Sequence, residues 1–486
     1  MTFTLGDQHD PATLADAGRL VAGATNEELA ARVRALVADN ARWRGAECLN
    51  LIAAESPTSP GVRALLSAEV GTRASGGHIG ALSRCFPGMV YIDQLEALCV
   101  ELLKDLFGSG FADQRLMGGM AGCMVAFTAL AEPGDHLMSL SLAAGGDSSG
   151  HDEGPGGARG LTVSSIPFDP VELTVDLDAF RREAEARRPR VVSLNQTTAL
   201  FPLPVREMKR IIEPWGGRLY FDGAHQAGLI AGRQYPDPLA EGADVLTGSG
   251  GKTFSGPQSG MILWNDEELS VPIVSAIFPV LTGSHQLNRV AALALAACEL
   301  REFGVGYMAA VVRNARALAA ALHARGFAVV GERRGFTATH QVLVDVRAHG
   351  GGVAVSQALE RAGIMVNKML LPAAEDVPDP VSEGIRIGTV EVTRLGMGPA
   401  EMETVADLIT RVVVAGEEPE AVAARVREFR SAFQILRFCF PAEPAEPAES
   451  AVPADPGELP ADPENGVSSP SGKKSSLRDA APNEVR

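Results

Sequence analysis

Five short apolar runs that alternate with helix-like stretches constrain the fold of this chain more than any other feature. The residues of these runs favour β-strands, and the stretches near 177–187 and 205–214 have the apolar spacing of helices. The five runs are His136–Leu140, Leu161–Ile166, Arg190–Leu194, Arg218–Phe221 and Asp244–Thr247. This alternation predicts an α/β fold in which crossover helices connect the strands of a mostly parallel sheet.

The regions on either side of these runs indicate further parts. Residues 26–44 and 90–107 have helical apolar spacing, and Gly108 is placed to end the second helix. A helix at about 286–303 leads to a region with α+β character, whose strand signals begin at Phe327, His340 and Gly384. We therefore expect an N-terminal arm and helix over 1–60, a large domain over 61–305, a small C-terminal α+β domain over 306–440, and a tail over 441–486.

The tail is predicted to be disordered. It holds nine of the 31 prolines and repeats Pro-Ala-Glu, with no apolar periodicity. Such a composition cannot bury enough apolar surface to offset the entropy lost on ordering.

Charge and composition exclude several classes of protein. The net charge is −17, with 60 acidic against 43 basic residues, which argues against nucleic-acid binding. No apolar run reaches membrane-spanning length, and the first residues do not resemble a signal peptide. The six cysteines lack metal-ligand spacing, so we expect no metal site and a reduced, cytoplasmic setting.

Two polar motifs follow neighbouring predicted strands. Asp222-Gly-Ala-His225 ends one strand, and Lys252, one of only six lysines, stands among glycines and hydroxyls after the next. A lysine that forms an imine with an aldehyde and a carboxylate that keeps a pyridine ring protonated are what a pyridoxal phosphate enzyme needs. The alternative is a strand-end aspartate that caps a helix and a surface lysine in a glycine loop.

Further segments in the same order resemble the serine hydroxymethyltransferase family from about residue 26 to 430. They are Leu51-Ile-Ala-Ala-Glu-Ser, Tyr91-Ile-Asp, Glu132-Pro-Gly-Asp, Phe221-Asp-Gly-Ala-His-Gln-Ala-Gly-Leu, Gly251-Lys-Thr-Phe-Ser-Gly-Pro, Phe278-Pro, Val366-Asn-Lys and Gly384-Ile-Arg-Ile-Gly-Thr. The resemblance implies a fold-type I, aspartate-aminotransferase-like enzyme with pyridoxal 5′-phosphate. It also implies a homodimer whose two active sites draw on both subunits.

The resemblance assigns roles to several residues. Lys252 would bind the cofactor, Asp222 its ring nitrogen, and His225 and Thr197 the region of its phenolic oxygen. Arg386 would grip the carboxylate of the amino acid substrate, a task that suits the guanidinium fork; alone, it would read as a surface arginine on a strand.

A phosphate site is expected where a helix begins after a glycine turn. Gly118, Gly119 and Met120 precede that helix, and backbone N–H groups at a helix start bind phosphate. Ser249 is expected nearby. Gly283 and Ser284 match a loop that reaches the phosphate in the neighbouring subunit of the family, although alone they would read as an ordinary turn.

The chain also departs from the family pattern. Where the family has a catalytic glutamate, two tyrosines and an asparagine for folate, this sequence has His78, Cys85-Phe86 and Met369. Gly251, Gln258 and Ala54 replace a histidine, an arginine and a serine close to the cofactor.

One family position can be aligned in two ways. The histidine that stacks on the cofactor ring matches Asp147 without a gap and His151 with a shift, and we favour His151 because a flat imidazole can stack. His78 stands in a glycine-rich loop, where it is a candidate base for the β-hydroxyl proton or a structural loop histidine.

These observations predict an enzyme that cleaves the Cα–Cβ bond of L-threonine, releases acetaldehyde and transfers the glycyl carbanion to a second aldehyde without folate. The sequence is similar to the L-threonine transaldolases of antibiotic and other natural-product pathways, which act on fluoroacetaldehyde or uridine-5′-aldehyde. The alternatives are a hydroxymethyltransferase acting on serine or α-methylserine with tetrahydrofolate, a simple threonine aldolase, and a non-catalytic binding protein with this fold.

Overall fold

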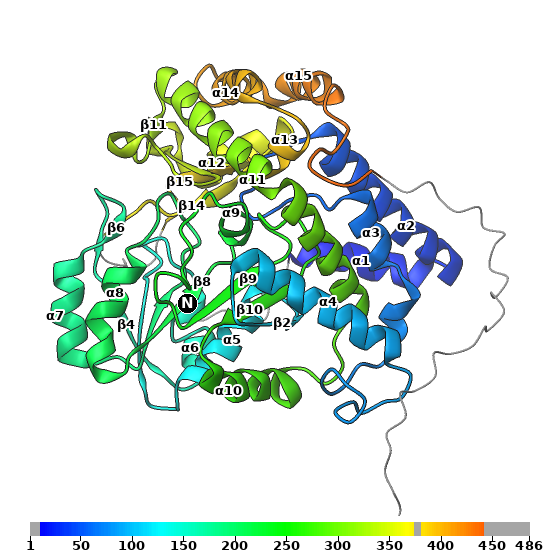
Figure 1. Ribbon diagram of the computed structural model, residues 1–486. Coiled ribbons are helices and arrows are strands. Elements are labelled where there is room, and N and C mark those ends of the chain that lie inside the picture. The colour runs from blue at the N-terminus through cyan, green and yellow to red at the C-terminus, as the bar shows by residue number, and fades with distance from the viewer. Residues whose placement is uncertain (1–9, 374–380, 442–486) are drawn as a thin grey trace, which may run out of the picture. The chain divides into compact units, whose positions relative to one another are not determined.

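The computed structural model describes residues 10–373 and 381–441, and its centre is a seven-stranded sheet (Figure 1). The strand order is β2-β10-β9-β8-β7-β3-β4; β10 is antiparallel to both of its neighbours, and the other neighbours pair in parallel. The strands are β2 (Phe111–Leu116), β3 (His136–Ser139), β4 (Thr162–Ser165), β7 (Val191–Leu194), β8 (Arg218–Asp222), β9 (Val245–Ser249) and β10 (Gly260–Trp264). The predicted α/β fold with a mostly parallel sheet is confirmed.

Helices cover both faces of this sheet. Successive strand residues point to opposite faces, so Leu219 and Phe221 of β8 join one hydrophobic core while Tyr220 between them joins another. The core with Tyr220 is covered by α5 (Gly119–Leu130) and α10 (Ser270–Ser275). The other is covered by α4 (Val90–Phe107), α7 (Leu177–Arg187), α8 (Val205–Ile212) and α11 (Leu287–Ala324).

Local sequence signals explain where these helices begin and end. The Asp176 side chain caps α7 by accepting a hydrogen bond from the N–H of Ala179. Gly108 ends α4 in the left-handed conformation, with φ of 64°. The helices predicted at 90–107, 177–187 and 205–214 are thus found as α4, α7 and α8.

The helix α11 is longer than predicted. The sequence indicated a helix over 286–303, but α11 runs for 38 residues to Ala324. Its buried residues continue through Val311, Leu318 and Leu322, and no proline interrupts them. The boundary expected between residues 305 and 306 therefore lies inside one helix.

A second, antiparallel sheet follows α11 in the chain. Its strand order is β11-β12-β15-β14, with β11 (Ala328–Val329), β12 (Gln341–Asp345), β14 (Asn367–Met369) and β15 (Gly384–Gly388). The helices of this region are α12 (Gly351–Arg361), α13 (Val390–Arg394), α14 (Pro399–Val413) and α15 (Pro419–Ser431), and Figure 1 shows α12, α14 and α15 around the sheet. β1 (Leu49–Asn50) pairs with β13 (Ile364–Met365), so Leu49 and Leu51 belong to the core of this region.

The N-terminal helices bury little of their surface. α1 (Pro11–Gly23) and α2 (Asn26–Arg42) have no buried residue, and Val21, Val33 and Val37 are exposed. The helix predicted at about 26–44 is α2. The remaining elements are α3 (Pro60–Leu66), α6 (Pro155–Ala158), α9 (Ala227–Ala231), β5 (Phe168–Asp169) and β6 (Thr174–Val175).

Within the described ranges, no helix is long and apolar enough to span a membrane. The same residues contain no group of three or more His, Cys, Asp or Glu side chains that could hold a metal ion. From Ala442 onward, the tail that was predicted to be disordered lies outside the described residues.

Candidate active site

Asp222 occupies the buried end of β8. The N–H of Ala224 donates to its Oδ1 at 2.9 Å, and the thiol of Cys123 on α5 donates to its Oδ2 at 3.2 Å. The side chain is 4% exposed, and burial raises its pKa; the charge of Asp147 adds to this, whereas Lys252 opposes it. A buried carboxylate with one weak donor on Oδ2 is a site for a cationic N–H group.

Lys252 follows β9, the strand next to β8. Burial lowers the pKa of its ammonium group, Asp222 raises it, and Arg386 lowers it. Among the described residues, none hydrogen-bonds to Nζ. A lysine whose neutral form is favoured by burial can attack a carbonyl carbon.

His225 is held in one tautomer by Gln341 of β12. The N–H of Ala199 donates to Oε1 of Gln341 at 2.9 Å, which orients the amide so that its Nε2 faces His225 Nδ1 at 3.3 Å. His225 Nδ1 is then the acceptor, and Nε2–H faces Thr197 Oγ1 at 3.2 Å. Burial, followed by the charges of Lys252 and Arg386, holds the pKa of His225 well below its ordinary value, so the ring is neutral.

Arg386 of β15 is a buried cation that has no acidic partner within the described ranges. Its Nη1 donates to the carbonyl and hydroxyl oxygens of Thr197, and its Nε donates to Asn367 Oδ1 at 3.2 Å. The side chain is 5% exposed, and burial lowers its pKa to about 10, so it stays charged at neutral pH. A buried unpaired guanidinium is a site for a carboxylate.

The start of α5 provides a place for a phosphate. Gly118 precedes the helix, and a Cβ there would meet no atom within 4 Å; one on Gly119 would touch only Ala224 Cβ at 3.4 Å. The first N–H groups of the helix are free for an anion. Met120 lies in this first turn, and Ser249 ends the neighbouring strand β9.

These groups fit pyridoxal phosphate. The N-terminus of α5 suits its phosphate, the buried carboxylate of Asp222 suits its ring nitrogen, and the amine of Lys252 suits its carbonyl carbon. Sequence and geometry thus agree on an amino acid enzyme with this cofactor.

Comparisons with known proteins give the same result. Residues 28–409 match serine hydroxymethyltransferase. The chain belongs to the serine hydroxymethyltransferase family. It is therefore a transferase that uses pyridoxal 5′-phosphate, with the fold-type I architecture.

Individual relatives match over most of their length. Serine hydroxymethyltransferase from Methanopyrus kandleri is 45% identical over 81% of this chain and 91% of the relative. The enzyme of that name from Korarchaeum cryptofilum is 42% identical, with 85% and 97% covered. Among solved structures, L-threonine transaldolase from Pseudomonas fluorescens in its internal aldimine state has a TM-score of 0.79 and 26% identity, covering 88% of this chain and 96% of that one.

The structure places Asp147, rather than His151, where its charge acts on the Lys252 cluster. Asp147 Oδ1 accepts hydrogen bonds from the N–H of Ser149 at 2.8 Å and from Asn195 Nδ2 at 3.0 Å, and its charge acts on Lys252 and Asp222. His151, the favoured candidate, shows no interaction with those two groups, and its Nε2 is buried without a partner among the described residues. The gap-free match is the one that the structure brings to the site.

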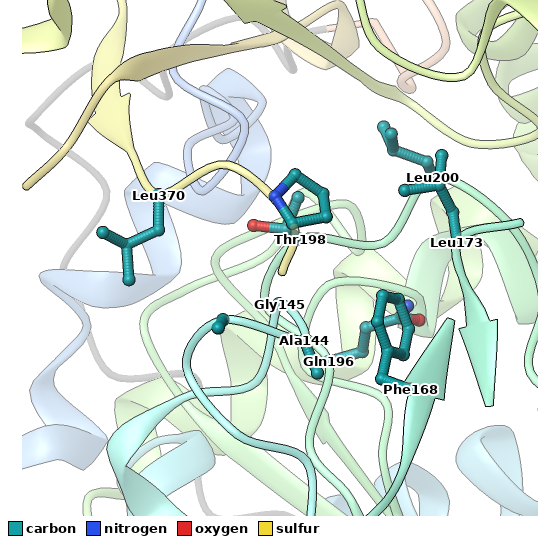
Figure 2. A pocket seen from close by; sticks show the side chains of 10 residues that line it. Ala144, Gly145, Phe168, Leu173, Gln196, Thr198, Leu200 and Leu370 are labelled. Carbon is teal, nitrogen blue, oxygen red and sulfur yellow. The ribbon is translucent and has the colours of Figure 1, made fainter. Parts of the chain in front are cut away.

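The same loops enclose a small cavity, which Figure 2 shows between Gln196, Thr198, Phe168 and Leu370. Its volume of about 10 Å³ is enough for one water molecule. Within the described residues, Gln196 Oε1 and Thr198 Oγ1 are buried without hydrogen-bond partners, so a water here would satisfy both. The cavity is a place for ordered solvent rather than for a substrate.

His78, Gly283 and Ser284 lie in another region of the chain. His78 Nδ1 is 3.4 Å from Arg115 Nη1, and its ring packs edge-on against Phe278 at 5.5 Å. It lines a cavity of about 270 Å³ that includes neither Lys252 nor Asp222. Ser284 Oγ accepts a hydrogen bond from the N–H of Ser75 at 3.3 Å. A single chain therefore holds only part of the predicted set together.

Sequence reasoning missed Cys123, Gln341 and Asn195. Cys123 looked like a small core residue, and Gln341 like one polar residue in an apolar strand. A polar side chain within an otherwise apolar strand was the signal that could have revealed Gln341, since buried polar groups need partners.

Proposed function

We propose that this enzyme cleaves the Cα–Cβ bond of L-threonine, releases acetaldehyde and joins the remaining glycyl unit to a second aldehyde, without folate. The product is a new β-hydroxy-α-amino acid. The buried guanidinium of Arg386 acts on Lys252 and has no acidic partner among the described residues. It is the observation that carries the amino acid substrate of this proposal, because it is built to hold a carboxylate.

The chain's own residues divide the work. Arg386 would hold the substrate carboxylate and so fix the orientation of Cα. His225 and Thr197 would supply hydrogen bonds to the region of the cofactor's phenolic oxygen. Gln341 holds the His225 ring in place for this through Nδ1. Bound pyridoxal phosphate supplies an electron sink for the pair left on Cα when the bond breaks.

A base must accept the β-hydroxyl proton as the C–C bond breaks and the aldehyde carbonyl forms. His78 is the candidate, contributed by a second copy of the chain in a homodimer with shared sites. Burial, and then the charge of Arg115, lower its pKa, so the ring is neutral and able to accept a proton at neutral pH. In the second half-reaction, Cα adds to the carbonyl carbon of the acceptor aldehyde, and the same group returns the proton.

The residues in the expected folate positions support a folate-independent reaction. Cys85 and Phe86 stand where the family has two tyrosines, and both are exposed. Met369 on β14 replaces an asparagine that would hydrogen-bond to the pterin. These replacements remove polar groups that a pterin requires.

Similarity to known proteins supports two different second substrates, an aldehyde and tetrahydrofolate. The transaldolase from Pseudomonas fluorescens supports an aldehyde as acceptor. The relatives at 42–45% identity favour the alternative, a serine hydroxymethyltransferase that uses tetrahydrofolate, acting on serine or α-methylserine. A threonine aldolase that only protonates the glycyl unit is the third possibility. We further propose a cytoplasmic enzyme of a natural-product pathway.

The test is acetaldehyde release from L-threonine by the purified holoenzyme without folate, with and without a trial aldehyde. L-Serine with tetrahydrofolate runs beside it. We expect acetaldehyde and, with the trial aldehyde, a new β-hydroxy amino acid detected by mass spectrometry. Turnover of serine with folate alone would overturn the proposal and establish the hydroxymethyltransferase; acetaldehyde and glycine alone would establish the aldolase.

A further inference from the structure

The helix α5 touches both ends of the cofactor site. Its N-terminus forms the phosphate cradle, and Cys123, one turn further on, reaches Asp222. This close approach depends on Gly122, because a Cβ there would lie 3.0 Å from Thr247 Cγ2. The backbone of α5 can therefore lie against β9 and bring the thiol within reach of the carboxylate.

A buried chain of hydrogen bonds ends on that carboxylate. Tyr220 OH lies 2.7 Å from Thr247 Oγ1 and donates to Cys123 Sγ at 3.2 Å, while the thiol donates to Asp222 Oδ2 at 3.2 Å. When the Thr247 hydroxyl donates to Tyr220, all the bonds point toward Asp222, and each strengthens the next. Cys123 and Tyr220 are at most 1% exposed, so water does not compete.

Burial is the largest influence on how strongly Asp222 holds a proton, and the hydrogen-bond donors adjust it. Each hydrogen bond to a carboxylate stabilises its charged form and lowers its proton affinity, and a thiol does this less than a hydroxyl or an amide. Thr247 Oγ1 is 3.5 Å from Oδ1, too far for a strong bond. Burial raises the pKa of the Cys123 thiol well above its ordinary value, so it acts as a neutral donor.

We propose that Cys123 is a positioning residue for Asp222. From the helix that carries the phosphate cradle, its thiol fixes Oδ2 in place while leaving the carboxylate a strong acceptor for the cofactor's ring N–H. The effect is independent of which aldehyde the enzyme accepts, because it concerns the cofactor alone.

The test compares Cys123→Ala and Cys123→Ser with the wild type. We expect the alanine variant to bind pyridoxal phosphate about tenfold more weakly when apo-protein is titrated, since it loses one hydrogen bond to a charged group. The midpoint of the pH titration of bound-cofactor absorbance should also shift. Asp147 and Lys252 are the charged groups acting on Asp222, and both remain in these variants. Serine restores a donor and should recover most of the affinity.

Two further variants separate this role from simple packing. Cys99→Ala removes a fully buried thiol from α4, away from Asp222, and should lower thermal stability without changing cofactor affinity. Tyr220→Phe leaves Cys123 in place but removes the hydroxyl that donates to its sulfur, so we expect a smaller loss of cofactor affinity. This variant tests the proposal even if Cys123→Ala folds poorly. The proposal would be overturned if both Cys123→Ala and Tyr220→Phe kept a cofactor affinity within twofold of the wild type and an unshifted pH midpoint.

Discussion

The Lys252 cluster and the loop that carries His78 are two halves of the predicted site with opposite physical character. Asp222 ends β8, Lys252 follows β9 and Arg386 lies within β15. Asp222 and Arg386 are at most 5% exposed. Cys85 and Phe86 of the loop are exposed, and His78 faces its own cavity. The difference teaches that the groups suited to cofactor and carboxylate come together within one chain, whereas the described residues do not bring His78 to them.

The largest expected effect is at Lys252. Lys252→Ala should abolish acetaldehyde release and remove the absorbance band of the covalently bound cofactor, because no other lysine among the described residues stands in the site. Lys104→Ala, which removes a lysine paired with Glu101 on α4, is the matched control and should keep both signals. A Lys252→Ala protein that still turned over L-threonine would break the first half of the comparison.

Arg386→Lys should weaken amino acid binding while leaving the cofactor in place. A lysine keeps the charge but loses the two-pronged geometry, which corresponds to a 10- to 100-fold rise in KM for L-threonine. The measurement is a KM and kcat determination with cofactor absorbance recorded beside it. An unchanged KM would place the carboxylate elsewhere.

Mixed subunits sharpen the comparison between the two halves. If His78 acts in the site of a second copy, Lys252→Ala and His78→Asn chains co-expressed in equal amounts form hybrids in which one site carries neither change. Random pairing should restore about a quarter of wild-type activity, although each variant alone is inactive. Mixing that restores nothing would mean that each chain uses its own His78 or none.

The smallest expected effect concerns Asp147 and His151. The negative charge of Asp147 favours the protonated form of the group at Lys252, so Asp147→Asn should move the midpoint of bound-cofactor absorbance to lower pH. His151→Asn, four residues along the same loop, should leave the midpoint in place. The reverse pattern would restore the shifted alignment, with His151 beside the ring.

The sequence predicted the strands β3, β4, β7, β8 and β9 because each is a short apolar run bounded by turn residues. It missed β2 and β10. Asp113, Gln114 and Arg115 interrupt the apolar pattern of β2, and β2 and β10 pair with each other although they lie far apart in the chain. Pairing between such distant segments is set by tertiary contacts that no local periodicity records.

The same limit applies to the site. Lys252, Asp222, His225 and Arg386 were found because each stands in a motif at a strand end or within a strand. Cys123 and Gln341 act through contacts with Asp222 and His225 that span about a hundred residues of sequence. Their roles depend on which elements pack together, and a single sequence does not state that.

The helix α11 contributes residues to the hydrophobic cores of both the large sheet and the second sheet. Its 38 residues form one continuous hydrogen-bonded rod about 57 Å long. Melting either half of this rod removes apolar support from the other, so the two regions share a single cooperative unit. Heating the protein should therefore unfold these two regions in one transition rather than two. A substitution at Leu318 should destabilise the lysine cluster as well as the second sheet.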